Sequence, residues 1–186
     1  MYDQQKKETL MHLAKEIKYS AVHVDFLSDR DVEILTGIGI PDSLSPFIDI
    51  ESEDRFGGYS LFDRVNIYEK YPLDKEDFKE LCLLGRCGDG YLVITRNGEV
   101  SLFDVYAEEL LPVNKSLDAF LDCAYEYSQF VHSINEKNGE GAYIDGNYSE
   151  DDVDLLRETL SKIDEAAVEE GFWADELVNL IDGIES

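Results

Sequence analysis

The dipeptide Asn97-Gly98 stands between two short runs rich in apolar residues, 91–96 and 99–104. Asparagine tolerates a positive φ angle and glycine adopts one freely, and both central residues of a type I′ turn need such an angle. The sequence therefore predicts a β-hairpin closed by this two-residue turn. The turn would set the strand register and place five pairs opposite each other: Arg96 with Glu99, Thr95 with Val100, Ile94 with Ser101, Val93 with Leu102, and Leu92 with Phe103.

Both faces of this hairpin carry apolar side chains, which indicates a sheet covered on one face and at least partly covered on the other. The run 80–86 predicts a further strand, and the turn at 87–90 leads from it into Tyr91, so these segments form a three-stranded meander. Additional strands are predicted at residues 46–52, where apolar Phe47 alternates with acidic or small residues, and at residues 59–69, after the flexible pair Gly57-Gly58.

Apolar side chains spaced by three and four residues predict helices on both sides of the meander in the sequence. One is expected over residues 3–18, and a second begins at a Ser28 cap and ends at Gly37. Later helices are expected after a cap at Ser116 or Asn114, from Ser149 through Ala167, and from residue 172 onward. The predicted fold class is α+β, an antiparallel or mixed sheet with a central meander, packed by N-terminal and C-terminal helices. We expect a single domain over residues 1–186, with 139–186 as its acidic helical part.

Charge is the dominant feature of the composition. The chain carries 42 acidic and 16 basic side chains, a net charge of -26. Residues 139–186 contain 15 acidic and 2 basic side chains, so half of the net charge falls in the last quarter of the chain. Nucleic acid, itself a polyanion, is therefore not expected as a direct partner. Two interpretations remain: a surface shaped by solubility, or a surface that meets a basic protein.

Motifs for phosphate, nucleotide and metal binding are incomplete. Residues 84–92 lack the lysine and the serine or threonine that follow the glycines of a phosphate-binding loop, and Asp42 replaces the third glycine of a dinucleotide fingerprint. A calcium loop starting at Asp145 would need glycine and glutamate where the chain has Glu150 and Leu156. Cys82, Cys87 and Cys123 are an odd number of cysteines, so we expect reduced thiols. For zinc, Cys82 and Cys87 have no second close pair, so we expect these two to be buried thiols in or beside the meander.

Catalytic patterns are also missing from the sequence. There is no strained serine elbow, and the three histidines are scattered along the chain. Among 42 acidic residues some carboxylates lie close together whatever the function, so such pairs do not by themselves indicate a hydrolase, although they leave one open. We therefore expect a protein that is not an enzyme, with no catalytic residues, cofactor or metal. The absence of a long apolar run and of a signal peptide predicts no membrane association and a cytoplasmic location.

Four stretches occur in a characteristic order: GIGIP at residues 37–41, LGRCGDGYLVITRNGEVSLFD at 84–104, PVNKSLDAFLDC at 112–123, and FWADELVNLIDG at 172–183. Together they resemble the SUKH superfamily, and most of all its fourth family of bacterial immunity proteins. Lys115 departs from the small residue expected in the third stretch. The resemblance implies an α+β fold and a role as the antidote encoded beside a polymorphic toxin. Toxins countered by this superfamily are commonly nucleases, so the implied partner is a basic, nuclease-like cognate toxin domain.

No binding residues can be carried over from the family, so the candidate surface rests on charge. A basic partner would be attracted by carboxylates and anchored by an aromatic side chain. The candidate partner-binding residues are Asp104, Tyr106, Glu108, Glu109, Tyr143, Asp151, Asp154, Glu158 and Glu165. For each acidic residue, a solvated surface position is the competing interpretation. The competing function is a non-catalytic adaptor or regulatory protein on the same scaffold, as the superfamily's eukaryotic signalling members suggest.

Overall fold

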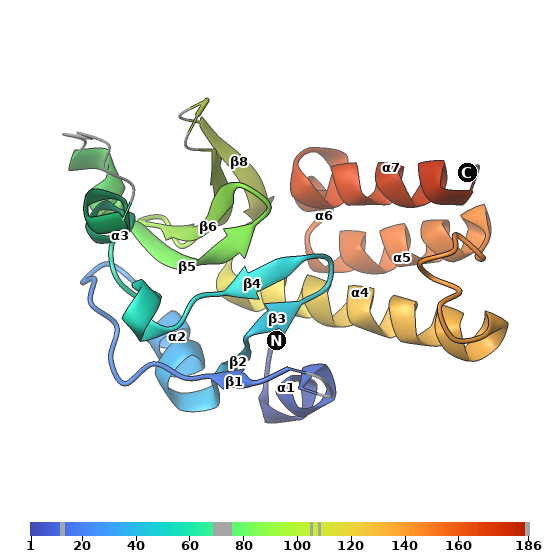
Figure 1. Ribbon diagram of the computed structural model, residues 1–186, viewed down its shortest axis with the longest axis horizontal. Helices are drawn as coiled ribbons and strands as arrows, with labels where there is room; N and C mark the ends of the chain where they lie inside the picture. The colour runs from blue at the N-terminus through green and yellow to red at the C-terminus, as the bar shows by residue number, and fades with distance from the viewer. Residues whose placement is uncertain (12–13, 69–75, 105, 108, 185–186) are drawn as a thin grey trace.

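An antiparallel β-sheet forms the centre of the computed structural model, which describes residues 1–11, 14–68, 76–104, 106–107 and 109–184. In these residues the sheet has six strands in sequence order (Figure 1): β3 (Ser43–Leu44), β4 (Ile48–Ile50), β5 (Leu81–Cys87), β6 (Gly90–Thr95), β7 (Val100–Asp104) and β8 (Glu109–Asn114). A smaller sheet pairs β1 (Glu16–Ile17) with β2 (Ile40–Pro41). The predicted meander is confirmed as β5, β6 and β7, and the sheet is antiparallel rather than mixed.

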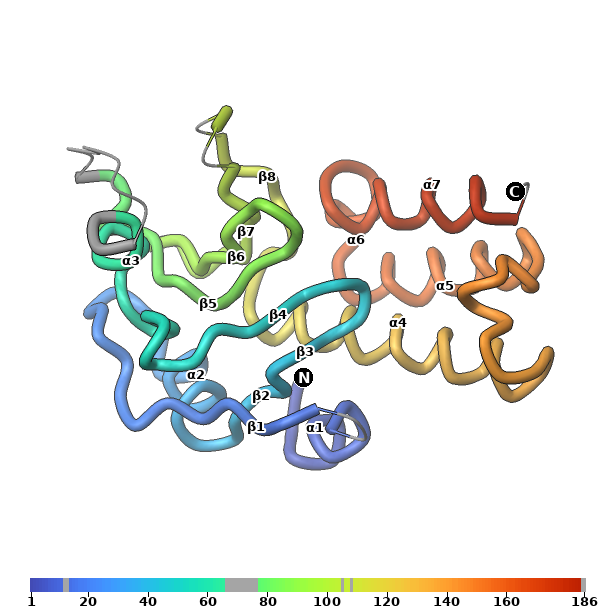
Figure 2. The backbone as a smooth tube through the Cα atoms, in the orientation of Figure 1, coloured from blue at the N-terminus to red at the C-terminus, as the bar shows by residue number. Residues whose placement is uncertain are grey.

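Helices precede the sheet, interrupt it and follow it. The shorter ones are α1 (Gln4–Leu10), α2 (Asp29–Val32), the π-helix η1 (Glu33–Ile38), the 3-10 helices η2 (Glu53–Arg55) and η3 (Glu76–Glu80), α3 (Leu61–Tyr68) and α6 (Glu165–Glu169). The longer ones are α4 (Leu117–Asn138), α5 (Glu150–Ile163) and α7 (Phe172–Ile184). Figure 2 shows α4, α5 and α7 stacked beside one another on the right, next to the sheet. The α+β prediction, with helices on both sides of the meander in sequence, is confirmed.

Both faces of the sheet are covered, as the apolar pattern of the hairpin predicted. On one face, Leu92, Ile94 and Val100 belong to a large core that includes residues of α4, α5 and α7. On the other face, Val93 and Phe103 belong to a smaller core with residues of α3 and η3. Successive residues of β6 therefore enter different cores because side chains alternate across a strand.

The turn at Asn97-Gly98 is real, but its predicted register is wrong by one residue. Ile94 pairs with Val100 and Leu92 with Leu102, while the Thr95 backbone N–H donates to the Glu99 carbonyl at 2.8 Å. The loop therefore contains Arg96 as well as the Asn-Gly pair. Gly98 has φ +84°, whereas Asn97 is not among the residues with a positive φ. This pattern matches a three-residue loop with one left-handed glycine, which adds a residue to the connection.

Two predictions near the N-terminal half are wrong in type or extent. The first helix ends at Leu10 instead of continuing to Lys18, because Glu16 and Ile17 form strand β1 and pair with β2. The Lys7 ammonium on α1 also forms an ion pair with the Glu16 carboxylate, with the two atoms 2.5 Å apart. The segment 59–69, predicted as a strand, contains helix α3, with Leu61 and Val65 one turn apart and buried. Residue 69 lies outside the described residues.

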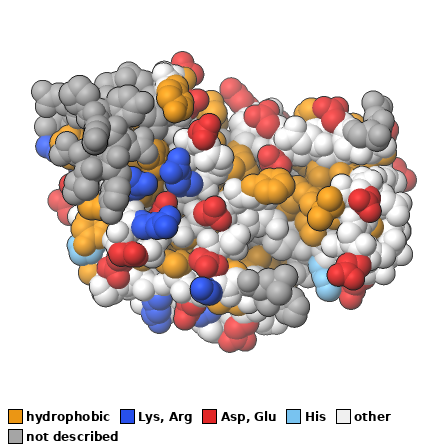
Figure 3. Space-filling view, in the orientation of Figure 1, with side chains coloured by type: hydrophobic (Ala, Val, Ile, Leu, Met, Phe, Trp, Pro, Cys, Tyr) orange, Lys and Arg blue, Asp and Glu red, His pale blue; other side chains and the backbone are white. Residues whose placement is uncertain are grey.

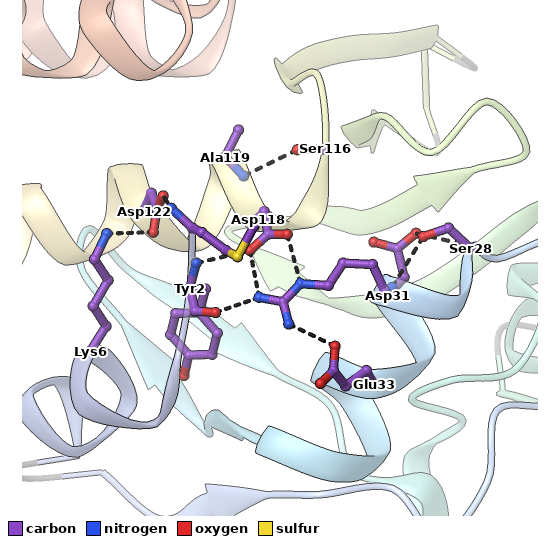
Figure 4. A network of polar contacts seen from close by, with 11 residues as sticks. Tyr2, Lys6, Ser28, Asp31, Glu33, Ser116, Asp118, Ala119 and Asp122 are labelled. Carbon is purple, nitrogen blue, oxygen red and sulfur yellow. Dashed lines mark hydrogen bonds and ion pairs between the residues drawn. The ribbon is translucent and has the colours of Figure 1, made fainter.

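The predicted second helix is confirmed at its start and extended at its end. Ser28 and Asp31 form the expected reciprocal cap, in which the Ser28 side chain accepts from the Asp31 backbone N–H. The helix then widens into η1 and ends at Ile38, and Gly39, not Gly37, takes the positive φ, of 83°. Arg30 of α2 donates to both carboxylate oxygens of Asp118 on α4, each at 2.9 Å. This contact, drawn with Tyr2 and Glu33 in Figure 4, joins the N-terminal segment to α4.

The helix expected from Ser149 through Ala167 is interrupted at Asp164. Ser149 and Asp152 form the predicted capping box, but α5 ends at Ile163 and α6 starts at Glu165. Asp164 has an extended backbone, with φ -153°, and its buried carboxylate accepts from Asn114 Nδ2 at 3.1 Å and from the Lys115 backbone N–H at 2.8 Å. These hydrogen bonds to the end of β8 hold Asp164 in the position where the helix breaks.

Candidate partner-binding site

Helix α5 has a buried side and a charged side. Ser149 and Asp152 close its first turn. The Asp152 carboxylate accepts hydrogen bonds from the Ser149 hydroxyl and backbone N–H, and these bonds lower the pKa of the Asp152 carboxyl below its ordinary value. Val153, Leu156 and Leu160 are buried against the core. Their spacing places them on one side of the helix, so the residues between them are turned toward solvent.

The solvent side of α5 brings together three of the carboxylates predicted from sequence. Asp151, Asp154 and Glu158 are exposed, and they follow each other at intervals of three and four residues. This spacing places neighbouring side chains about 5–6 Å apart at their Cβ atoms. Leu155 shares the same stripe, and 63% of it is exposed. We call these four residues, Asp151, Asp154, Leu155 and Glu158, the α5 face.

Little positive charge offsets the α5 face. Arg157 Nε lies 4.0 Å from Asp154 Oδ1, and both side chains are well exposed, so this pair contributes little to stability. Acidic residues near the first turn of a helix are favoured by the helix dipole, so the fold tolerates a negative charge at Asp151. The result is an apolar side chain among carboxylates with little counter-charge, an arrangement suited to a partner with basic groups around an apolar contact.

Leu155 is the residue that the sequence interpretation missed. Its spacing from Asp151 and Glu158 was visible in the sequence, and an apolar residue at that spacing among acids was the available signal. Glu165, by contrast, does not continue the α5 face. It is exposed at the first position of α6, beyond the break at Asp164.

A second group of predicted residues lies at the end of the β7–β8 hairpin. Asp104 pairs with Glu109 across the two strands, and Tyr106 between them is 79% exposed. Glu108 lies outside the described residues. Asp104 accepts from the backbone N–H groups of Tyr106, at 2.7 Å, and Ala107, at 3.0 Å, so its carboxylate also supports the turn. Figure 1 shows this hairpin end well separated from α5, so the two groups of predicted residues form different surfaces.

Tyr143 is held mainly by its own fold contacts. Its hydroxyl is 2.9 Å from the hydroxyl of Tyr127, and its ring packs edge-on against Phe130 and stacks with Tyr148. Burial raises the pKa of the Tyr143 phenol above its ordinary value. The half-buried ring therefore presents less free surface to a partner than Tyr106 does.

Metal binding and membrane insertion find no support in the described parts of the chain. Across residues 1–11, 14–68, 76–104, 106–107 and 109–184, no three His, Cys, Asp or Glu side chains are grouped so that they could hold a metal ion. Over the same ranges, none of the helices combines the length and the apolar character needed to cross a membrane.

Comparison with known families identifies the relationship. The profile of the SUKH-4 immunity protein family matches residues 17–179, which is most of the chain. The chain belongs to the SUKH-4 immunity protein family. No curated protein and no solved structure matches it significantly. In this SUKH-4 protein two of the stretches that carried the resemblance meet in space, since Trp173 Nε1 donates to Asn114 Oδ1 at 2.7 Å.

Proposed function

We propose that this protein binds a cognate toxin domain directly and neutralises it in the cytoplasm of the cell that produces both. Membership of the SUKH-4 immunity protein family is the observation that carries this proposal. The partner that fits best is a nuclease-like domain with a basic surface, because a protein that grips phosphate groups presents cationic side chains. The role is one of binding and needs no catalytic group on the immunity protein.

The α5 face supports this choice of partner. Its carboxylates are exposed and carry little counter-charge, so they attract a basic surface from a distance and speed the encounter. Leu155 supplies an apolar contact that is desolvated on binding. The net charge of -26 adds a long-range field of the same sign and also repels nucleic acid, which keeps the surface free for protein.

A survival assay tests the neutralising role. The toxic C-terminal domain encoded beside this gene is expressed in bacteria with and without the full immunity chain, and the purified pair is then tested for a complex. Survival only when both are present, together with a stable complex, is the expected result. Cell death in both cases and no complex would overturn the proposed function, and survival without a complex would show that neutralisation is indirect.

Association kinetics test the α5 face. The triple variant Asp151→Asn, Asp154→Asn, Glu158→Gln is expected to slow association about tenfold at low salt, with less effect at high salt and little effect on dissociation. The matched control is Asp25→Asn, Asp29→Asn, Asp89→Asn, which removes the same charge from exposed positions outside α5. If both triple variants slowed association equally, the effect would come from net charge, and the α5 face would not be the binding surface.

Two single substitutions separate the two candidate surfaces. Leu155→Ala should accelerate dissociation of the complex about tenfold, since loss of a desolvated apolar contact acts mainly on the dissociation rate. Tyr106→Ala removes a larger exposed side chain from the end of the β7–β8 hairpin and should change dissociation less than about threefold. The reverse result would place the contact on the hairpin end instead of on α5.

A further inference from the structure

A groove of about 550 Å³ lies where β4, β5, η2 and α3 meet. Its lining includes Arg55, Arg64 and Arg86, half of the six arginines in the chain. Figure 3 shows basic side chains gathered to the left of centre on this face, in a protein whose acidic side chains outnumber the basic ones by 42 to 16. Such a concentration of guanidinium groups runs against the charge of the chain as a whole.

Two of these arginines are held against the same aromatic ring. The guanidinium carbon of Arg86 lies 5.0 Å from the ring centroid of Tyr91, and that of Arg64 lies 5.8 Å from it. Tyr91 is fully buried, so its ring is a fixed support. For Arg86, a contact through the ring face positions the guanidinium group without using its N–H donors, which stay available for hydrogen bonds.

None of the described carboxylates that line the groove forms an ion pair with the Arg86 guanidinium. Asp49 stands opposite Arg86 in the β4–β5 register, yet no ion pair within 4.0 Å joins their side chains. Among the described residues, the Arg86 guanidinium makes no side-chain hydrogen bond or ion pair, and its backbone takes part only in the sheet. Asp42 accepts instead from the Lys15 backbone N–H, at 2.8 Å. Glu51 lies 3.9 Å from Arg55. Arg86 is thus a positioned cation whose donors face no protein acceptor in the described part of the chain.

We propose that this groove binds the oxyanion group of a small molecule, a phosphate or a carboxylate, with Arg86 as its principal contact. The guanidinium fork matches both groups by paired, charge-assisted hydrogen bonds. Arg64 and Arg55 also line the groove and add to its positive charge. The groove volume falls within the range of about 300–1,000 Å³ typical of small-molecule sites. This site does not depend on toxin binding and stands whether or not the proposed function does.

The net charge of the protein weakens such binding without preventing it. Distant carboxylates repel an anion, but at about 0.15 M salt their field falls off over roughly 8 Å, whereas the arginines act at contact distance. Measurements therefore belong at a constant ionic strength near this value, where local contacts decide the affinity.

The test is titration of the full chain with inorganic phosphate, and in parallel with acetate, followed by amide chemical shifts. We expect saturable binding of at least one anion with a Kd of about 1 mM or tighter. Stronger binding of phosphate points to a phosphorylated ligand, and stronger binding of acetate points to a carboxylate. Absence of saturation for both anions up to about 20 mM would overturn the proposal.

Substitutions locate the site. Arg86→Gln should weaken binding at least about tenfold, and Arg86→Lys, which keeps the charge but loses the fork, should weaken it by about threefold to tenfold. The matched control is Arg96→Gln. Arg96 also lies over an aromatic ring, that of Phe26 at 5.4 Å, but its guanidinium pairs with Glu80 at 3.0 Å. We expect Arg96→Gln to bind within about twofold of the native chain, and a loss equal to that of Arg86→Gln would overturn the assignment.

Discussion

Trp173 donates its indole N–H to Asn114 Oδ1 at 2.7 Å, and both side chains are buried. The amide nitrogen of the same Asn114 donates to Asp164, so one side chain connects β8, the α5–α6 break and α7. Asn114→Ala leaves the indole donor without its acceptor and the Asp164 carboxylate with one donor fewer. We expect it to lower the free energy of unfolding by about 2–4 kcal/mol in urea denaturation.

The control for this prediction is Asn147→Ala, which changes the same residue type at an exposed position. It should cost less than about 0.5 kcal/mol. Similar losses in the two variants would show that the buried contact contributes nothing particular to stability.

The contact between Arg30 and Asp118 should make the stability of the fold depend on pH. The hydrogen bonds from Arg30 hold the pKa of the Asp118 carboxyl below its ordinary value. A carboxyl with a depressed folded-state pKa stabilises fully above its unfolded value, about 3.9, and loses that contribution as pH falls through the folded value. Asp118→Asn should therefore cost about 1–2 kcal/mol at pH 7, and the difference from the native chain should shrink below about pH 4.

Denaturation of both chains at several pH values measures this difference. Asp151→Asn serves as the comparison, because Asp151 is exposed, and its effect should stay small. A cost of Asp118→Asn that stays constant from pH 7 down to about pH 3 would contradict the assigned role of the Arg30 contact.

The geometry of the hairpin loop predicts that alanine at Gly98 costs more stability than alanine at Asn97. Gly98 has φ +84° and open space where a Cβ would stand, so Gly98→Ala should cost about 1–2 kcal/mol from backbone conformation alone. Asn97→Ala should cost less than about 0.5 kcal/mol, because Asn97 has no positive φ to support. Thermal or urea unfolding of the two variants decides the matter, and equal costs would favour the type I′ turn instead.

The three cysteines are free and differ in exposure. Burial raises the pKa of all three thiols, to about 12 for Cys82 and for Cys123, but Cys87 is only half-buried and is therefore the most accessible to a reagent. Because thiolates are the reactive species, a thiol reagent at about pH 8 should modify Cys87 first and reach the other two only after unfolding. Cys87→Ser should remove the early reaction. Fast modification of more than one thiol in the native chain would contradict this order.

Local signals in the sequence located several structural features well. The Ser116 and Ser149 caps mark the starts of α4 and α5, because a serine hydroxyl satisfies backbone N–H groups within its own turn. The strand β5 and the hairpin that follows it were also evident from their apolar pattern. Such features depend on residues a few positions apart, which is why the sequence alone indicated them.

Features that depend on distant contacts could not be predicted in this way. The α5–α6 break follows from hydrogen bonds between Asp164 and the end of β8. Residues 61–68 form α3 because Leu61 and Val65 pack on the sheet. Within the candidate site, the spacing of Asp151, Asp154 and Glu158 was available from the sequence. The exposure of Leu155 was not, because it depends on which side of α5 the rest of the fold covers.

Amino-acid order and composition were sufficient for the α+β class, the family relationship, the strong negative charge and the capped starts of α2, α4 and α5. These features rest on short-range periodicity, capping and side-chain count. The packing of separate segments alone decided the hairpin register, the separation of the α5 face from the β7–β8 end, and the meeting of Arg55, Arg64 and Arg86 in one groove. These arrangements join residues far apart in the chain, and such contacts form only when the whole core packs, so no local sequence pattern predicts them.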